Sequence, residues 1–378
     1  MNIEKMDSVI HLQPFIPHYR EEFLSLLGKR LKVKGIEGQP IVQKIYTYEK
    51  TKDMKSASFK VSDVVCKNLP CKLIKGKLLF YNPFSLLGKD ILVLVLMLHF
   101  AHVGTWLLLF TKWFHHRKII LWGQGISVRR YLKEEHKPDW KLKCMISLAD
   151  GIWFYMDKEK EQWQKLFPKK PMVALHNTLT GVDDMMRYRA ELSIEELKKK
   201  YGVRQEVILI FCARFIADRR VDLLLEAIKR LNSQKYGFVI IGAGASKPDF
   251  SIYDNVYDFG AVYDTAVKRE LFALADVYFQ PGWVGLSIVE AMAYGKPIFT
   301  FKRSEETLQC VEYSYIYHGE NGLIFHDIDD CIRNVEALPA EEIKRMGDNA
   351  REYVAKHLRI EQMVENAMNV IDKVCKTK

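Results

Sequence analysis

The chain has 378 residues, of which 48% are hydrophobic and 28% are charged. This length suits two domains better than one, and the apolar content can bury a proper core. Its seven cysteines are scattered and odd in number, which argues against a disulfide framework and for a reducing cytoplasm. Cys66 and Cys71 are the closest pair, but they lack nearby histidine or cysteine partners, so the sequence does not indicate a zinc site. The first 16 residues are mixed and charged, unlike a signal peptide.

Charge is distributed unevenly along this chain of net charge +10. The first 180 residues hold 30 lysines and arginines against 16 aspartates and glutamates, a net charge of +14, whereas the remainder carries −4. This basic half has no helix-turn-helix, zinc-finger or RNA-recognition signature, so we expect no nucleic acid partner. An anionic membrane surface explains the charge instead, and predicts a cytoplasmic protein that is peripheral on the inner face of the cell membrane.

Short apolar segments alternate with helical patterns in the first half, as in a doubly wound sheet. We predict strands over 9–13, 119–122 and 173–176 and a helix over 19–27. A linker between two domains is expected near residues 178–190.

The longest apolar run, 91–110, is just long enough to cross a bilayer. His99 and His102 lie at its centre, where ionisable side chains would be expensive in a membrane. We therefore predict a buried strand over 91–98 and, after a loop, a helix over 105–114. A membrane-spanning helix is the alternative.

The segment 112–118 ends this helical pattern with two aromatic residues among five basic ones. Two interpretations remain open. The segment lies on a membrane interface, where such mixtures are common, or it is a helix end whose cations favour the dipole.

Two strand–loop–helix patterns in the second half carry the clearest functional signal. In the first, a buried strand leads into a loop with Arg214, Arg219 and Arg220, and an amphipathic helix follows. Guanidinium groups beyond a strand's carboxyl end suit a diphosphate, because each can bond two oxygens at once. Alternatively, each arginine caps a helix or pairs with Asp218 or Asp222.

The second pattern spans 281–301 and reads PGWVGLSIVEAMAYGKPIFTF. A glycine-containing loop opens a helix here, so the N–H groups at Leu286 and Ser287 and the positive helix end form a site for a phosphate. Glu290 lies about one turn deeper, where its carboxylate can accept hydrogen bonds from a ribose. The Gly-x-Gly at 242–244 indicates only a tight turn, because the third glycine of a dinucleotide fingerprint is missing.

In this order, the patterns resemble the donor-binding domain of glycosyltransferase family 4, retaining enzymes of the GT-B fold. Arg214 matches the family's arginine, and Arg219 takes the place of its lysine. The later segment 320–325, ENGLIF, also resembles the family, so the resemblance runs from about 207 to 325. The matching residues of the loop and helix are Gly285, Leu286, Glu290, Ala291, Met292, Ala293, Gly295 and Pro297.

One position departs from the family pattern. Gly282 stands where the family has the first of two glutamates eight residues apart, the second of which is Glu290. That glutamate is usually placed near the transferred sugar. The departure therefore bears on sugar specificity and on activity itself.

The resemblance implies an α/β protein of two Rossmann-like, doubly wound domains that face a central cleft. Residues 1–180 are then the acceptor-binding domain, residues 181–359 the nucleotide-sugar domain, and residues 360–378 a helix that crosses back to the first domain. The segments 13–23 and 122–125 also resemble, more loosely, members that build bacterial surface polysaccharides.

The implied reaction transfers a sugar from a nucleotide-diphosphate sugar to a hydroxyl of a glycan or lipid-linked acceptor, with retention. Arg214 and Arg219 are the expected catalytic residues, because they face the charge that grows on the diphosphate. We expect no cofactor and no metal. The Asp-x-Asp at 327–329 is interpreted as a helix start, with Asp329 or Asp330 as N-cap.

The remaining site predictions follow from position in the fold. The donor-binding residues are expected to be Gly282, Gly285, Leu286, Ser287 and Glu290. Possible sugar or acceptor contacts are His99, His102 and Gln124, on loops at strand ends of the first domain. Each histidine fits a partly buried, hydrogen-bonded imidazole equally well.

Three other functions compete with transfer. A non-catalytic nucleotide-sugar-binding subunit of a glycan-assembly complex would explain Gly282. A sugar-nucleotide epimerase shares the architecture, but its second domain would need an acid–base pair that the sequence does not show. A membrane-surface interaction protein would leave the loop with Arg214, Arg219 and Arg220 without a role.

Overall fold

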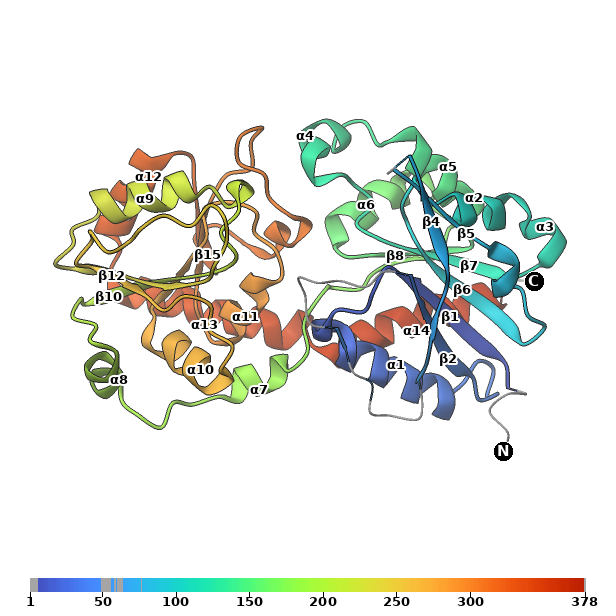
Figure 1. The fold of residues 1–378 in the computed structure, drawn as a ribbon, viewed down its shortest axis with the longest axis horizontal. Coiled ribbons are helices and arrows are strands. Elements are labelled where there is room, and N and C mark those ends of the chain that lie inside the picture. The colour runs from blue at the N-terminus through green and yellow to red at the C-terminus, as the bar shows by residue number, and fades with distance from the viewer. Residues whose placement is uncertain (1–5, 49–55, 58, 60–63, 76, 377–378) are drawn as a thin grey trace. The chain divides into compact units, whose positions relative to one another are not determined.

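Two compact α/β units make up the protein, which we describe from a computed structural model (Figure 1). The first unit contains residues 1–180 and 360–378, and the second contains residues 181–359. The residues that the structure describes are 6–48, 56–57, 59, 64–75 and 77–376.

The first unit is built on a seven-stranded sheet with the order β3-β2-β1-β6-β7-β8-β9, in which every neighbouring pair is parallel. Its strands are β1 (Ser8–Gln13), β2 (Val42–Thr47), β3 (Val64–Asn68), β6 (Ile91–Met97), β7 (Lys118–Trp122), β8 (Gly151–Phe154) and β9 (Met172–Ala174). All residues of β1 and β8 are buried, as expected for central parallel strands covered on both faces. A separate antiparallel hairpin consists of β4 (Cys71–Ile74) and β5 (Leu78–Tyr81).

The helices of the first unit are η2 (His18–Arg20), α1 (Glu21–Val33), η3 (Pro83–Leu86), α2 (Val103–Phe110), α3 (Lys112–His115), η4 (Val128–Arg130), α4 (Tyr131–Glu134), α5 (Trp140–Leu148), α6 (Asp157–Leu166) and α14 (Ile360–Lys376). The C-terminal helix α14 packs on α1, β8 and β9, so the end of the chain lies in the first unit. Gly151 permits this contact, because a Cβ there would lie 2.6 Å from Cγ1 of Val370.

The apolar run 91–110 is broken into strand β6 and helix α2, which confirms the predicted break. The predicted helix over 105–114 was inexact, because α2 begins earlier and ends before Thr111, and α3 is a separate short helix. Gly104 fits the first turn of α2 because the Tyr81 ring packs there, 2.7 Å from where a Cβ would stand. None of the described helices is long and apolar enough to cross a membrane.

The second unit is built on a six-stranded parallel sheet with the order β12-β11-β10-β13-β14-β15. Its strands are β10 (Val207–Cys212), β11 (Tyr236–Ile241), β12 (Val256–Asp258), β13 (Val277–Phe279), β14 (Ile298–Phe301) and β15 (Gly322–Phe325). Its helices are α7 (Val182–Arg187), α8 (Ile194–Tyr201), η5 (Ala217–Arg219), α9 (Val221–Arg230), α10 (Thr265–Leu274), α11 (Ser287–Ala293), η6 (Val311–Tyr315), α12 (Ile328–Ala337) and α13 (Ala340–His357). The expected linker at 178–190 thus contains a short helix, α7.

The strand order positions the candidate site. Strand β10 pairs with β13, so the loops that follow these two parallel strands leave the same edge of the sheet. The first loop, residues 213–220, carries the three arginines and is called the arginine loop below. The second, residues 280–286, is the loop before α11. The two patterns that the sequence singled out are therefore neighbours in space.

Candidate functional site

Arg214 lies where the chain continues β10 past its last residue. The N–H of Ala213 donates to the carbonyl of Ile241 at 3.0 Å, and the N–H of Phe215 donates to the carbonyl of Ala243 at 3.0 Å. The backbone on both sides of Arg214 is thus held like a strand. The side chain is exposed, and within the described part of the chain no residue forms a hydrogen bond with its guanidinium group. Arg214 can therefore bind an anion.

The Gly-x-Gly segment after β11 serves close packing rather than the tight turn that the sequence predicts. A Cβ at Gly242 would lie 2.0 Å from the carbonyl oxygen of Ala213, and one at Gly244 would lie 2.3 Å from that of Phe215. Both glycines also have φ near +152°, which L-residues with a side chain rarely adopt. The segment is thus shaped to support the arginine loop.

Arg219 joins the arginine loop to the loop before α11. Its Nη1 donates to the carbonyl of Trp283 at 2.6 Å, and the N–H of Gly282 donates to the carbonyl of Arg219 at 3.2 Å. Burial lowers the pKa of the Arg219 guanidinium, and the positive charge of Arg214 acts in the same direction. Two cations that repel each other in a partly buried place favour a bound anion.

Arg220 has the structural role that the sequence left open for each arginine. Its Nη2 lies 2.6 Å from Oδ2 of Asp222, and its Nη1 donates to the hydroxyl of Thr307. The hydrogen bond from Arg220 holds the pKa of the Asp222 carboxyl below its ordinary value. Arg220 has φ of +53° at the start of α9, where this pairing helps to hold an unfavourable backbone conformation.

Two buried glutamines shape the loop before α11, and no sequence pattern indicated either of them. Nε2 of Gln280 donates to the carbonyls of Gly282 at 3.1 Å and Trp283 at 2.8 Å. Oε1 of Gln309 accepts the N–H of Val284 at 2.8 Å, and its Nε2 donates to the carbonyl of Pro281 at 3.1 Å. These bonds satisfy the polar backbone of a buried loop. They fix its path before the helix begins.

The start of α11 offers free backbone donors. In the described structure the N–H groups of Gly285, Leu286 and Ser287 donate to no protein acceptor, whereas that of Ile288 donates to the carbonyl of Gly285. The Ser287 hydroxyl is already used, because it donates to Oε1 of Gln280 at 3.0 Å. Ser287 therefore offers a ligand its backbone N–H and not its side chain.

Glu290 forms an ion pair with a lysine that no sequence pattern indicated. Nζ of Lys268, on α10, lies 2.7 Å from Oε2 of Glu290, and the two side chains are 28% and 14% exposed. Burial disfavours the Lys268 ammonium, but the Glu290 carboxylate outweighs this effect and raises its pKa. No described residue forms a hydrogen bond with Oε1 of Glu290, so that oxygen can accept one from a ribose hydroxyl.

Gly282 is packed against the arginine loop. A Cβ at this position would lie 2.7 Å from the carbonyl oxygen of Asp218 and 2.9 Å from Cγ of Arg220. A glutamate could not stand here unless the arginine loop moved. The close approach of the arginine loop therefore requires a glycine at position 282, where the family pattern has a glutamate.

A separate cavity of about 420 Å³ lies in the first unit, near the carboxyl ends of β6, β7 and β8. His99, Gln124 and Tyr155 are among its lining residues. His102 is not: it is buried, and its Nε2 lies 3.5 Å from the Tyr48 hydroxyl. Burial and the charge of His99 lower the pKa of His102 to about 4, and burial also lowers the pKa of His99. Both imidazoles are then neutral at pH 7.

The Asp-x-Asp segment caps a helix, although not through the residue predicted. Oδ1 of Asp327 accepts the N–H of Asp330 at 2.8 Å, so Asp327 is the N-cap of α12, and the prediction of Asp329 or Asp330 was wrong. Asp329 instead lies 2.6 Å from Nη2 of Arg230. Among the described residues, no group of three histidine, cysteine, aspartate or glutamate side chains could hold a metal ion.

Comparison with known proteins agrees with this geometry. Residues 206–340 match the model of a family described as glycosyl transferases group 1. This region contains the arginine loop, the loop before α11 and both members of the Lys268–Glu290 pair. No curated protein matches the chain by sequence at a significant level.

Several solved structures have a similar fold over nearly the whole length of this chain. A lipopolysaccharide outer core galactosyltransferase, WaaB, is 13% identical with a TM-score of 0.66, and the match covers 97% of this chain and 99% of that one. HepE of Anabaena, in complex with UDP, is 13% identical with a TM-score of 0.63 and coverages of 97% and 100%. A putative UDP-N-acetylglucosamine 2-epimerase from Listeria monocytogenes is 10% identical with a TM-score of 0.57 and coverages of 99% and 98%.

At such low identities these likenesses show the fold alone. The first unit and the second unit are each Rossmann-like, with a parallel sheet and packed helices. The chain therefore has the GT-B fold, and its second unit contains the region that matches glycosyl transferases group 1.

Proposed function

We propose that this protein is a glycosyltransferase, which moves a hexosyl-type unit from a nucleotide-diphosphate sugar to an acceptor hydroxyl and retains the anomeric configuration. One observation carries the proposal. The arginine loop and the loop before α11 are hydrogen-bonded to each other at the ends of adjacent strands, within the region that matches glycosyl transferases group 1. HepE, which has the same fold, binds UDP.

The chemistry requires stabilisation of a leaving diphosphate. As the bond from the sugar to phosphate breaks, negative charge grows on the diphosphate, and preorganised donors that meet this charge lower the barrier. Arg214, Arg219 and the N–H groups of Leu286 and Ser287 are the donors that we assign to it. A departing phosphate oxygen can take the acceptor proton, so no strong base is needed. Glu290 binds the ribose.

The acceptor belongs, in this proposal, to the cavity of the first unit. Neutral His99 and the amide of Gln124 line it and can form hydrogen bonds with a sugar. The net charge of +14 in residues 1–180 suits a phosphorylated, lipid-linked acceptor. The name of WaaB, a lipopolysaccharide enzyme, supports a growing surface glycan as the acceptor class. We accordingly place the protein on the cytoplasmic face of the membrane.

Metal independence is part of the same proposal. Arg214 and Arg219 supply positive charge to the diphosphate, which is the task that a divalent cation performs in other transferases. Transfer should therefore continue in the presence of a chelator such as EDTA. Loss of transfer in EDTA, restored by Mg²⁺ or Mn²⁺, would contradict this part.

A second candidate function rests on Gly282. Because this position cannot carry the family's glutamate without a shift of the arginine loop, the chain also fits a non-catalytic nucleotide-sugar-binding subunit of a glycan-assembly complex. The epimerase with a similar fold shows that the fold does not decide between reactions.

Nucleotide screening by thermal shift tests the proposal. The candidates are UDP, GDP and ADP, and one that binds should stabilise the protein by about 2.7 kcal/mol at a hundred times its dissociation constant. The nucleotide that binds then defines which nucleotide sugars to incubate with the chain and with extracted lipid-linked glycans. Release of the nucleoside diphosphate with a labelled glycan supports transfer. Binding without turnover supports the non-catalytic subunit, an isomerised sugar supports the epimerase, and no binding to any nucleotide overturns the proposal.

A further inference from the structure

Large apolar side chains are exposed together on one part of the first unit. Of the 17 large hydrophobic residues that are exposed in the described structure, nine lie between residues 73 and 114. We call these nine the apolar surface: Leu73, Ile74, Leu78, Phe80, Phe84, Leu107, Phe110, Trp113 and Phe114. Exposed apolar residues scattered singly are ordinary, but such a concentration indicates a binding surface.

The hairpin β4–β5 contributes one face to this surface. Lys72 is paired with Phe80 and Ile74 with Leu78, and residues directly opposite each other on antiparallel strands point to the same side. On the opposite face Leu79 and Tyr81 are buried in the core, whereas Leu73, which is paired with Leu79, is exposed. The hairpin therefore presents Ile74, Leu78 and Phe80 on one exposed face together with Lys72, and Leu73 beyond the core on the other.

Helices α2 and α3 carry a second group of exposed apolar side chains. Leu107, Phe110 and Phe114 are spaced three and four residues apart, which places them on one side of the helical segment. Leu108 and Leu109 point the other way and are buried. Phe114 and its neighbour Trp113 are each 75% exposed.

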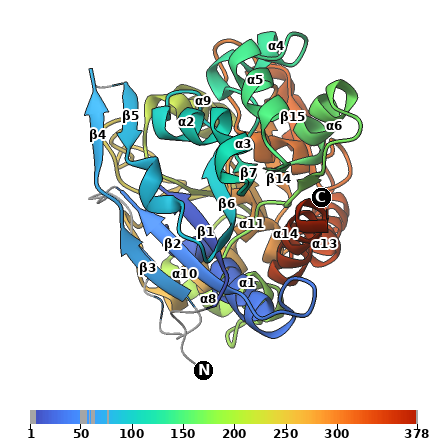
Figure 2. The same ribbon diagram turned by 90° about the vertical axis from the view of Figure 1, so that its right-hand side faces the viewer.

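The hairpin and α2 lie side by side and are in contact (Figure 2). The N–H of Leu79 donates to the carbonyl of Ala101 at 2.9 Å, and the hydroxyls of Tyr81 and Thr105 lie 2.8 Å apart. Helix α2 also contacts η3, which carries the exposed Phe84. The elements that carry the apolar surface are therefore packed against one another.

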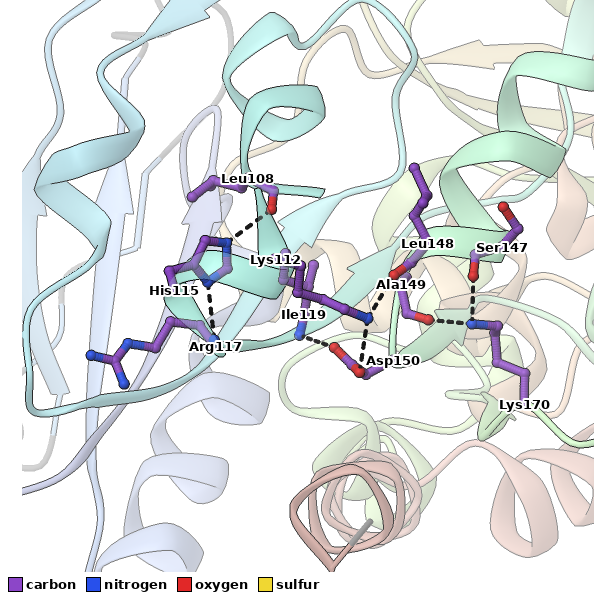
Figure 3. Close-up of polar contacts among 10 residues, drawn as sticks. All are labelled: Leu108, Lys112, His115, Arg117, Ile119, Ser147, Leu148, Ala149, Asp150 and Lys170. Carbon is purple, nitrogen blue, oxygen red and sulfur yellow. Dashed lines mark hydrogen bonds and ion pairs between the residues drawn. The ribbon is translucent and has the colours of Figure 1, made fainter. Parts of the chain in front are cut away.

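Lys112, the first residue of the segment 112–118, reaches toward Leu148 and Asp150 and so ties α3 to the end of α5 (Figure 3). Nζ of Lys112 lies 3.0 Å from Oδ1 of Asp150 and 2.8 Å from the carbonyl oxygen of Leu148. Nη2 of Arg117 donates to the carbonyl of Gly88 at 3.0 Å. The structure thus gives Lys112 and Arg117 structural roles rather than the membrane contacts that the sequence suggested.

The positive charge of the surface comes from the hairpin instead. Residues 64–118 contain eight lysines and arginines but a single acid, Asp90, which pairs with Lys44. Lys72, Lys75 and Lys77 are exposed on the hairpin or at its turn. Aromatic and aliphatic side chains bordered by lysines, without free carboxylates, suit the interface of an anionic bilayer.

We propose that the apolar surface inserts into the headgroup region of an anionic membrane, while Lys72, Lys75 and Lys77 contact the lipid phosphates. This deepens the peripheral location proposed above and does not depend on transfer activity. Insertion of apolar side chains, rather than charge alone, is the main source of affinity. Phe84, Trp113 and Phe114 are the most exposed of these side chains and are the first to enter the bilayer.

Co-sedimentation of the full chain with vesicles tests the proposal. The probes are vesicles of phosphatidylcholine alone and of phosphatidylcholine mixed with phosphatidylglycerol. Wild type should bind the anionic vesicles, and replacing Trp113 and Phe114 together by serine should weaken this binding by at least about tenfold. Replacing Lys72, Lys75 and Lys77 by glutamine should weaken it and flatten its salt dependence. Trp140→Ser is the matched control, because Trp140 is 72% exposed outside the apolar surface.

Three results would overturn the proposal. They are no binding of wild type to either vesicle, undiminished binding of the Trp113 and Phe114 variant, or an equal loss in Trp140→Ser. Wild type that self-associates in sedimentation velocity but ignores vesicles would assign the surface to a second copy of the chain. The thermal midpoint of each variant, measured without vesicles or nucleotide, shows that it is folded. Stabilisation by added nucleotide in the same measurement tests the proposed transfer function separately from membrane binding.

Discussion

Nζ of Lys268 lies 2.7 Å from Oε2 of Glu290, so the carboxylate assigned to the ribose is oriented by a lysine from another helix. The pair leaves Oε1 of Glu290 available for a ligand. A positioned carboxylate discriminates a ribose from a deoxyribose better than a mobile one, because less rotamer entropy is lost on binding.

Glu290→Gln should weaken nucleotide binding and shrink the preference for ribonucleotides over 2′-deoxynucleotides. The expected loss is about 1.5–3 kcal/mol, the range for a hydrogen bond to a charged group. Lys268→Gln is the comparison variant, because it keeps the carboxylate. It should retain most of the ribose preference while it destabilises the second unit, since it leaves Glu290 unpaired in a partly buried place. Calorimetric titration with both nucleotides measures each preference. An unchanged preference in Glu290→Gln would remove this residue from the site.

Arg214→Ala should abolish transfer and weaken binding of the nucleoside diphosphate by about 1.5–3 kcal/mol, without loss of stability. The reason is that its exposed guanidinium has no hydrogen-bond partner among the described residues. Arg220→Ala is the matched control in the same loop. It breaks the contacts with Asp222 and Thr307, so it should lower the thermal midpoint of the second unit more than Arg214→Ala does. Wild-type turnover in Arg214→Ala would show that the site is misplaced.

Gly282→Glu should not restore the family's missing glutamate. Its Cβ would lie 2.7 Å from the carbonyl oxygen of Asp218, so the arginine loop has to shift. Gly282→Ala places the same Cβ without the carboxylate and separates crowding from charge. Both variants should lose stability, of the order of 1–3 kcal/mol for an overpacked site, and bind nucleotide less tightly. Thermal shift with and without nucleotide measures both effects. Faster transfer in Gly282→Glu at wild-type stability would contradict this account.

Sequence patterns predicted the parts of the site that depend on local order along the chain. The arginine loop and the loop before α11 each follow an apolar strand and precede a helix, so their location at strand ends was readable. His99 and Gln124 were placed at strand ends for the same reason, and both line a cavity.

The contacts that the sequence did not reveal join distant segments. Gln280 and Gln309 hold the loop before α11 from two sides, and neither has a motif that distinguishes it from other glutamines. Lys268 is 22 residues from Glu290 and reaches it only because α10 packs nearby. The sequence left a membrane interface and a helix end open for the segment 112–118, because it shows Lys112 among aromatics but not its distant partner, Asp150. Local sequence patterns predict helices, strands and loops, whereas the role of a side chain depends on partners that are distant in the sequence.

The last prediction concerns the core of the first unit and the effect of acid. His11 lies in β1 with no exposed surface, and neither of its ring nitrogens has a hydrogen-bond partner in the structure. Burial lowers the pKa of His11 to about 3. In the unfolded chain a histidine titrates near 6.5, so between these values the unfolded state binds a proton that the folded state does not. The free energy of unfolding is therefore unaffected by His11 above about pH 6.5. It falls as the pH is lowered from 6.5 toward 3.

The expected loss from His11 is about 2 kcal/mol between pH 7 and pH 5, at 1.36 kcal/mol per pH unit below the unfolded pKa. His11→Leu should remove this dependence, because leucine binds no proton in either state. Tryptophan fluorescence during urea unfolding measures it in the first unit, which holds six of the seven tryptophans, and the Trp153 ring centre lies 5.8 Å from that of His11. His102 remains in both proteins, and its lowered pKa contributes a dependence of the same sign to each. Free energies of unfolding that fall equally with acid in wild type and His11→Leu would show that His11 takes up its proton while folded.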